Sequence, residues 1–137
     1  MILALLIFTS SYKVEGAEEK VYSTVSLPFR DLSASDITEE MGLGWNLGNT
    51  MDGHSAFMPS ETTWQSVVTT SELVDAVHNS GFNTIRIPVT WGLKIDDENN
   101  YTIDEAWMNR VREIAEYGLS QDMYVIINIH HDGAEQT

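Results

Sequence analysis

Thr84-Ile85-Arg86-Ile87-Pro88-Val89 and Tyr124-Val125-Ile126-Ile127-Asn128-Ile129 are two short runs that are rich in β-branched residues, and each predicts a β-strand. Pro88 cannot donate to a sheet ladder, so it marks where the first of these strands stops pairing. Strands that are apolar along nearly their whole length indicate a sheet that is buried on both faces.

Two helical patterns accompany these strands: one precedes the first strand, and the other lies between the two strands. Thr69 and Glu72 predict a capping box that opens a helix, and Gly81 suits the turn that ends it. Its apolar positions keep helical spacing: Leu73, Val74, Ala76 and Val77. Asp104 is expected to cap a second amphipathic helix, whose apolar stripe is Ile103, Trp107, Val111, Ile114 and Gly118.

An earlier helix and a first short strand precede this pattern. Ser33 and Asp36 predict an N-terminal cap for a helix over Ala34 to Met41, which ends at Gly42. Residues 43–49 then predict a short strand, followed by a long polar loop that reaches Thr69. A loop of that length in a compact domain is usually functional or disordered.

The alternation of strand and helix predicts parallel βαβ units, hence an α/β fold. A doubly wound sheet would carry a glycine-rich phosphate loop after its first strand, and no G-x-G-x-x-G occurs there. A TIM (β/α)8 barrel places its chemistry at the carboxyl ends of the strands, where Asn46, Arg86 and His130 fall. One unit takes about 40 residues and eight would take roughly 320, so we expect a barrel truncated after its third strand, with open edges that favour aggregation.

The N-terminal residues predict a targeting segment. Met1 to Phe8 is an unbroken apolar run, too short for a membrane span of roughly 20 residues. We interpret residues 1–16 as a signal peptide cleaved before Ala17, residues 17–32 as an extended leader, and residues 33–137 as part of the folded domain. A buried N-terminal strand is the alternative. Cleavage would leave a secreted, extracellular protein without a membrane anchor.

Composition narrows the possible partners. The formal charge is -14, from seven Lys and Arg against 21 Asp and Glu. This charge would repel nucleic acid, whereas it neither attracts nor repels neutral sugars. Cysteine is absent, so the sequence contains no disulfide, thiolate metal site or cysteine nucleophile.

Three polar residues in apolar strands are candidate site residues. Arg86 is costly between Ile85 and Ile87 unless acceptors or a carboxylate meet it, either in a catalytic site or in a salt bridge to a neighbouring strand. The amides of Asn46 and Asn128 must be hydrogen-bonded to each other, to backbone or to a ligand.

The histidines permit three interpretations. His130 and His131, with His54 and Asp132, could bind a metal, but adjacent residues on a strand point to opposite faces unless the strand has already ended. We favour one histidine facing the barrel mouth and the other packed beneath a loop, with two purely structural histidines as the alternative.

Tryptophans are the remaining candidates. Trp107 falls on a helical apolar stripe and is expected in the core. Trp45, Trp64 and Trp91 fall near the carboxyl ends of strands, where an aromatic ring could stack on a pyranose, although each could equally be packing.

Several motifs in order resemble glycoside hydrolase family 5, and the cellulases of its subfamily 4 in particular. They run from about Leu27 to Gly133 and comprise Gly44-Trp45-Asn46-Leu47-Gly48-Asn49-Thr50, Glu61-Thr62-Thr63-Trp64, Gly81-Phe82-Asn83-Thr84-Ile85-Arg86-Ile87-Pro88-Val89-Thr90-Trp91, Tyr101-Thr102-Ile103-Asp104 and Ile127-Asn128-Ile129-His130-His131-Asp132.

The resemblance implies a retaining endoglucanase on a TIM barrel, with one glutamate after strand four as acid/base and another after strand seven as nucleophile. Both would lie beyond Thr137, and Asp52, Glu61 and Asp132 are better interpreted as loop ligands or hydrogen-bond acceptors. Arg86 would hold the nucleophile ionised, His130 would contact the sugar and His131 would support that wall. Asn46, Trp45 and Trp91 would line the substrate cleft.

By the same resemblance the intact protein would be a monomer that cleaves internal β-1,4 bonds of β-glucans without metal or other cofactor, and the 137 residues alone would be inactive. Cellulose, mixed-linkage glucan, xyloglucan and xylan remain possible substrates. Two other functions stay open: a non-catalytic glucan-binding module that uses Trp45, Trp64 and Trp91, and a metal-dependent hydrolase that uses His54, His130, His131 and Asp132.

Overall fold

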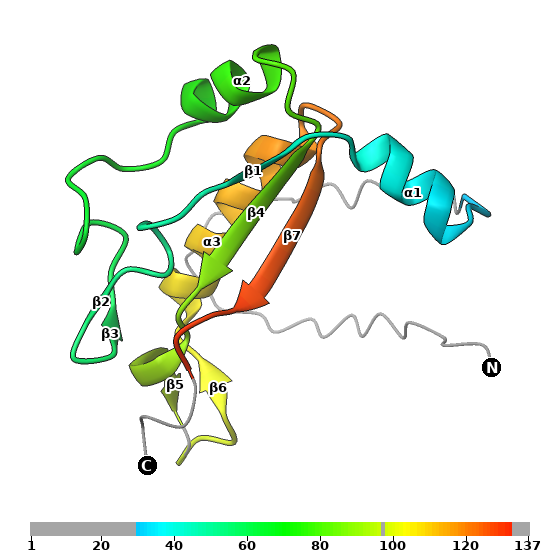
Figure 1. Ribbon diagram of the computed structural model, residues 1–137. Helices are drawn as coiled ribbons and strands as arrows, with labels where there is room; N and C mark the ends of the chain where they lie inside the picture. The colour runs from blue at the N-terminus through cyan, green and yellow to red at the C-terminus, as the bar shows by residue number, and fades with distance from the viewer. Residues whose placement is uncertain (1–29, 97, 133–137) are drawn as a thin grey trace, which may run out of the picture. The chain divides into compact units, whose positions relative to one another are not determined.

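The computed structural model describes residues 30–96 and 98–132, and the described residues from Leu32 onward form one compact unit. The predicted signal peptide and most of the predicted leader lie outside the described residues. Three parallel strands form the central sheet in the order β1-β4-β7 (Figure 1). Their bounds are β1 (Gly44–Asn46), β4 (Thr84–Val89) and β7 (Tyr124–Ile129), which confirms the predicted parallel βαβ pattern.

Three helices accompany the sheet: α1 (Ala34–Met41), α2 (Ser71–Asn79) and α3 (Glu105–Leu119). The capping box of Ser33 and Asp36 is present at α1, and the side chain of Asp104 accepts from the Trp107 N–H at the start of α3. Helix α3 lies behind β4 and β7 (Figure 1). A Cβ on Gly118 would lie 3.0 Å from Ile85 Cγ2, so glycine allows this close approach of helix and sheet.

The core lies between the sheet and α3. Ile85, Ile87 and Val89 have no exposed surface and alternate along β4 with Arg86, so successive side chains face opposite sides of the sheet. From the helix, four of the predicted stripe residues are buried: Trp107, Val111, Ile114 and Gly118. Burying each large apolar side chain contributes roughly 1.5–3 kcal/mol. The indole N–H of Trp107 also donates to Thr90 O, which confirms its predicted place in the core.

The start of α2 differs from the prediction by one residue. Thr70, not Thr69, is the N-cap, and its side chain accepts from the Leu73 N–H. Thr69 is instead buried. Its N–H donates to Glu61, and its carbonyl accepts from Arg110. The predicted turn at Gly81 is present with a φ of 95°. Along the helix, Val74 and Val77 are buried, whereas Leu73 and Ala76 are exposed.

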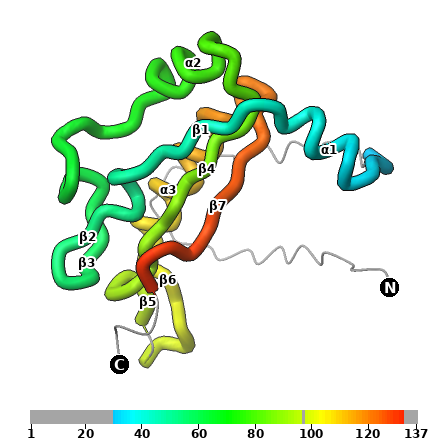
Figure 2. The backbone as a smooth tube through the Cα atoms, in the orientation of Figure 1, coloured from blue at the N-terminus to red at the C-terminus, as the bar shows by residue number. Residues whose placement is uncertain are grey.

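Two small antiparallel hairpins were not predicted, and the first of them lies within the predicted long loop that reaches Thr69. They are β2 (His54–Ser55) with β3 (Met58–Pro59), and β5 (Ile95–Asp96) with β6 (Thr102–Ile103), the latter preceded by the 3-10 helix η1 (Gly92–Lys94). Ile103 therefore belongs to a strand and not to the stripe of α3. Both hairpins lie toward the carboxyl ends of the parallel strands (Figure 2).

One edge of the sheet is open among the described residues. β7 pairs only with β4, and Ile126, Ile127 and Ile129 are 39%, 46% and 71% exposed. Apolar strand residues with this exposure indicate a surface that further secondary structure would cover. None of the described helices is long and apolar enough to cross a membrane.

Candidate active site at the carboxyl ends of the strands

Arg86 joins side chains from three successive strands. It lies opposite Asn46 in the register of β1 and β4, and its Nη1 donates to Asn46 Oδ1 at 2.5 Å. Its Nη2 lies 3.5 Å from Nδ1 of His130, which directly follows β7. The structure therefore brings together Asn46, Arg86 and His130, as their positions at strand ends predicted.

The surroundings of His130 favour one tautomer. Arg86 Nη2 and Asn128 Nδ2 lie 3.5 and 3.4 Å from the same ring nitrogen, Nδ1, and both groups can only donate. Nδ1 is therefore placed as the acceptor, which leaves Nε2 as the nitrogen that carries the hydrogen in this tautomer. An Nε2–H at the mouth of a strand can donate to a hydroxyl or carboxylate oxygen.

Asn128 bonds differently from Asn46. Its Nδ2 donates to the carbonyl of Ile129 at 2.7 Å, while its buried Oδ1 has no partner among the described residues. Of the possibilities left open by the sequence, Asn46 thus meets the side chain of Arg86, whereas Asn128 meets backbone and the ring of His130. A buried oxygen without a donor leaves one acceptor at the site unused.

The anion expected beside Arg86 does not come from the part of the chain that the structure describes. Within residues 30–96 and 98–132, no carboxylate lies within salt-bridge distance of this guanidinium. Arg86 is partly buried, and its five N–H groups can serve several acceptors. It is thus a half-enclosed cation that can receive a carboxylate.

His131 belongs to a cluster of rings beneath His130. Its ring centroid lies 4.4 Å from that of His130, 5.2 Å from that of His54 and 5.4 Å from that of Trp64. Phe57 stacks on His54 with ring centroids 5.3 Å apart. The cluster packs the segment after β1 against the residues after β7, which fits the predicted supporting role of His131.

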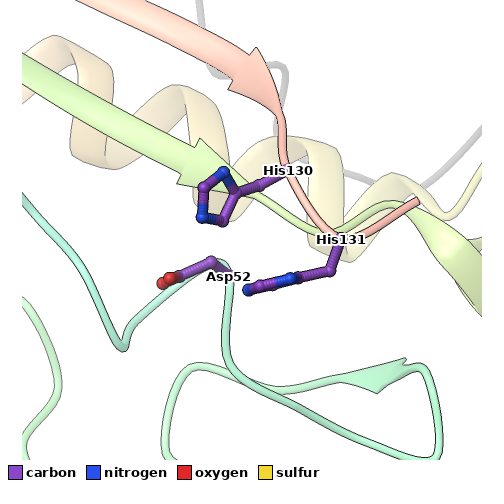
Figure 3. A group of neighbouring side chains, drawn as sticks. All are labelled: Asp52, His130 and His131. Atoms are coloured by element: carbon purple, nitrogen blue, oxygen red, sulfur yellow. The ribbon is translucent and has the colours of Figure 1, made fainter. Parts of the chain in front are cut away.

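Asp52, His130 and His131 converge, as Figure 3 shows, with one ligand atom from each lying within 4.8 Å of the others. The two histidines can face the same space because β7 ends at Ile129. Ligand atoms around a tetrahedral zinc would lie roughly 3.4 Å apart, so the group would have to contract. The cation of Arg86 beside His130 also opposes a metal ion.

The other residues of the metal hypothesis are used elsewhere. Asp132 accepts from the backbone N–H groups of Trp91 and Gly92 at 2.8 and 2.6 Å. His54 Nδ1 accepts from the Phe57 N–H at 3.3 Å. Neither side chain belongs to the group formed by Asp52 and the two histidines.

Trp45 and Trp91 pack against the core. Trp45 lies beside Ile85 in the register, so its side chain faces the helix side of the sheet and not the side of Arg86. Trp91 lines a cavity of about 410 Å³ together with Ile95, Ile103, Ile127 and Ile129. Both therefore have packing roles in the structure, and their contact with substrate stays a prediction. Trp64 is 42% exposed.

Glu61 and Arg110 form an interaction that the sequence pattern did not predict. Arg110 Nε and Nη2 donate to the two oxygens of Glu61 at 2.9 and 3.0 Å. Burial alone would raise the pKa of Glu61, but hydrogen bonds from Arg110 and Thr69 outweigh it and lower that pKa. The same pairing raises the pKa of Arg110. The two residues lie 49 positions apart, so no local signal could have paired them.

Comparisons with known proteins identify the family of the chain. The family model described as cellulase (glycosyl hydrolase family 5) matches residues 47–137. Endoglucanase B of Clostridium cellulovorans is 42% identical over 131 residues, which cover 96% of this chain and 28% of that protein.

Solved structures extend the agreement. A GH5-4 broad specificity endoglucanase from Ruminococcus champanellensis with bound cellotriose is 46% identical, with a TM-score of 0.71 over 76% of this chain and 32% of that one. A family 5 xyloglucanase from Paenibacillus pabuli is 44% identical, with a TM-score of 0.70 over 72% of this chain and 28% of that one. The chain thus spans about 30% of the length of these relatives.

Proposed function

The chain belongs to glycoside hydrolase family 5, and from this membership we propose that it supplies the first three strands of a retaining endoglucanase that cleaves internal β-1,4 bonds of β-glucans. The family fold is a TIM barrel, and the β1-β4-β7 sheet is its first part. The whole enzyme would be a secreted monomer, with residues 1–16 as its signal peptide.

The observation that carries this proposal is the array of Asn46, Arg86 and His130. It places a guanidinium, an imidazole and an amide at the carboxyl ends of adjacent parallel strands, where barrels of this kind hold their substrates. A retaining glycosidase needs two carboxyl groups about 5 Å apart, one of them an ionised nucleophile. Arg86 offers the positive charge that keeps such a carboxylate ionised.

Each residue then has a distinct role. Arg86 would hold the nucleophilic glutamate, which we place outside the described residues. The Nε2–H of His130 would donate to a sugar hydroxyl at the cleavage point. His131 would support that imidazole from below, and Asn46 would fix the orientation of Arg86 through its 2.5 Å hydrogen bond.

A β-glucan is the substrate class that the relatives support. One related structure holds cellotriose, another is called a xyloglucanase, and a third is a family 5 lichenase from Caldicellulosiruptor in complex with cellotetraose. The cleft of this chain would accordingly accept a β-linked glucose backbone. The choice among decorated and mixed-linkage glucans would depend on loops of the later strands.

The test compares the 137-residue chain with a barrel completed by the downstream reading frame. Both are assayed for reducing ends on carboxymethylcellulose, mixed-linkage β-glucan, xyloglucan and xylan, and the anomeric configuration of the first product is followed by NMR. We expect retention by the complete barrel and no turnover by the chain alone. A complete barrel without activity on these substrates would refute the proposal, and turnover by residues 17–137 would refute the placement of the catalytic glutamates.

A further inference from the structure

We propose that Glu61 and Arg110 are positioning residues for the active site. Their ion pair holds residues 61–69 so that Trp64 supports His131 and, through it, His130. This inference rests on the proposed function, because it takes His130 to be part of the sugar site. Neither residue would touch substrate itself.

Glu61 and Arg110 meet in a bidentate geometry. The guanidinium meets the carboxylate through two nitrogens and two oxygens, at 2.9 and 3.0 Å, which is the bidentate arrangement that adds orientation to attraction. The side chains are only 20% and 11% exposed, so water screens the pair less than it would a surface ion pair. Arg110 extends from α3, the rigid helix behind the sheet.

The ion pair also binds the far end of the segment that follows Glu61, at Thr69. One carboxylate oxygen of Glu61 accepts from the Thr69 N–H at 2.6 Å, and Arg110 Nη2 donates to the Thr69 carbonyl at 2.6 Å. The pair therefore fixes both ends of residues 61–69, a segment without helix or strand. Val67 and Val68 are 63% and 49% exposed, so these polar contacts take the place of apolar anchoring.

Trp64 connects this segment to the site. Trp64 follows Glu61 by three residues, and its ring centroid lies 5.0 Å from that of His54 and 5.4 Å from that of His131. His131 in turn lies 4.4 Å from His130. Trp64 is 42% exposed, so its position depends on these ring contacts and on the backbone that the ion pair holds. A displacement of about 1 Å at a catalytic site can cost on the order of a hundredfold in rate.

The experiment uses the complete barrel with Glu61→Ala, Arg110→Ala, the double variant, Arg110→Lys and the control Glu116→Ala, which removes an exposed charged residue from the same helix. For each, kcat and KM are measured per folded molecule on mixed-linkage β-glucan. Hydrogen exchange of residues 61–69 is measured alongside. We expect both single alanine variants to lose roughly tenfold in kcat/KM, with a lower kcat.

If Glu61 and Arg110 act as a pair, two further results are expected. The double variant should lose no more than either single variant, because the two residues act as one unit. Arg110→Lys should recover part of the loss, since lysine keeps the charge but not the bidentate contact. The control should match the parent in both measurements.

Other results would overturn the inference. Faster hydrogen exchange in residues 61–69 with unchanged kcat/KM would mean that the pair anchors the segment without positioning the site, and additive losses would mean that the residues act separately. If the alanine variants do not fold, Arg110→Lys and Glu61→Gln decide on the same criteria. An inactive parent refutes the proposed function as well, whereas an active parent with unaffected variants refutes this inference alone.

Discussion

Asn46 on β1 accepts a 2.5 Å hydrogen bond from Arg86 on β4, which holds the guanidinium across the first two strands of the sheet. The other terminal nitrogen of Arg86 reaches toward His130 after β7. Two contacts leave most of the five N–H donors of this side chain for another acceptor. The residue is thus oriented before any carboxylate from the rest of the barrel reaches it.

Replacing Arg86 should slow catalysis because it raises the pKa of the nucleophilic carboxylate. In the complete barrel, Arg86→Ala removes the charge that lowers the pKa of that carboxylate, an effect of about 1–3 pKa units for an adjacent arginine. We expect kcat/KM to fall about a hundredfold or more at neutral pH, and the acidic limb of its pH profile to move upward. Asn46→Ala is the matched control and should cause a smaller loss. A profile that keeps its acidic limb in Arg86→Ala would contradict the assigned role.

Removing Asp132 should destabilise the segment after β4. Its carboxylate accepts from two backbone N–H groups, of Trp91 and Gly92, and Asp132→Ala leaves both without that acceptor. The free energy of unfolding of the complete barrel should fall by roughly 1–3 kcal/mol. Urea unfolding measures this, with the exposed Glu98→Ala as control. A loss equal to that of the control would show that these hydrogen bonds are replaced by water.

The pair of Glu61 and Arg110 should make stability depend on pH in acid. The pKa of Glu61 is lowered from its ordinary value of 4.5, so its contribution is fully present above that value and is lost as the pH falls through the lower folded-state pKa. Urea midpoints of the parent should therefore exceed those of Glu61→Gln at neutral pH and converge with them below the ordinary carboxyl range. A difference that stays constant down to low pH would exclude this linkage.

Chelation should leave the proposed activity unchanged. Asp52, His130 and His131 lie close together, but their spacing and the charge of Arg86 disfavour a resident ion. Dialysis of the complete barrel against a chelator, followed by elemental analysis and the β-glucan assay, should give full activity without bound metal. Activity that disappears with the metal and returns when it is added back would instead support the metal-dependent alternative.

The elements with the strongest periodicity could be predicted from sequence. β4 and β7 are continuous β-branched runs, and α3 carries a full apolar stripe behind the Asp104 cap, so tertiary contacts only reinforce the local preference. The two hairpins were missed because strands of two residues have no period. Their turns also place Ala56, Phe57, Asn100 and Tyr101 at positive φ, where sequence patterns look for glycine.

Part of the candidate site could also be predicted from the sequence, and part could not. Arg86 could be identified as functional because an arginine is costly in an apolar strand, and Asn46 and His130 because parallel strands bring their carboxyl ends together. The ring cluster and the pairing of Glu61 with Arg110 depend on how a long loop folds back over the sheet. Nothing in the residues near either partner encodes that path.

The order of strands in the sheet, β1-β4-β7, is also the order in which a ribosome makes them. Each strand after β1 therefore emerges with its neighbour already synthesised, so the sheet can grow during translation without waiting for a distant partner. The open side of β7 would be the growing edge, and its exposed isoleucines would stay accessible to chaperones until the next strand emerges.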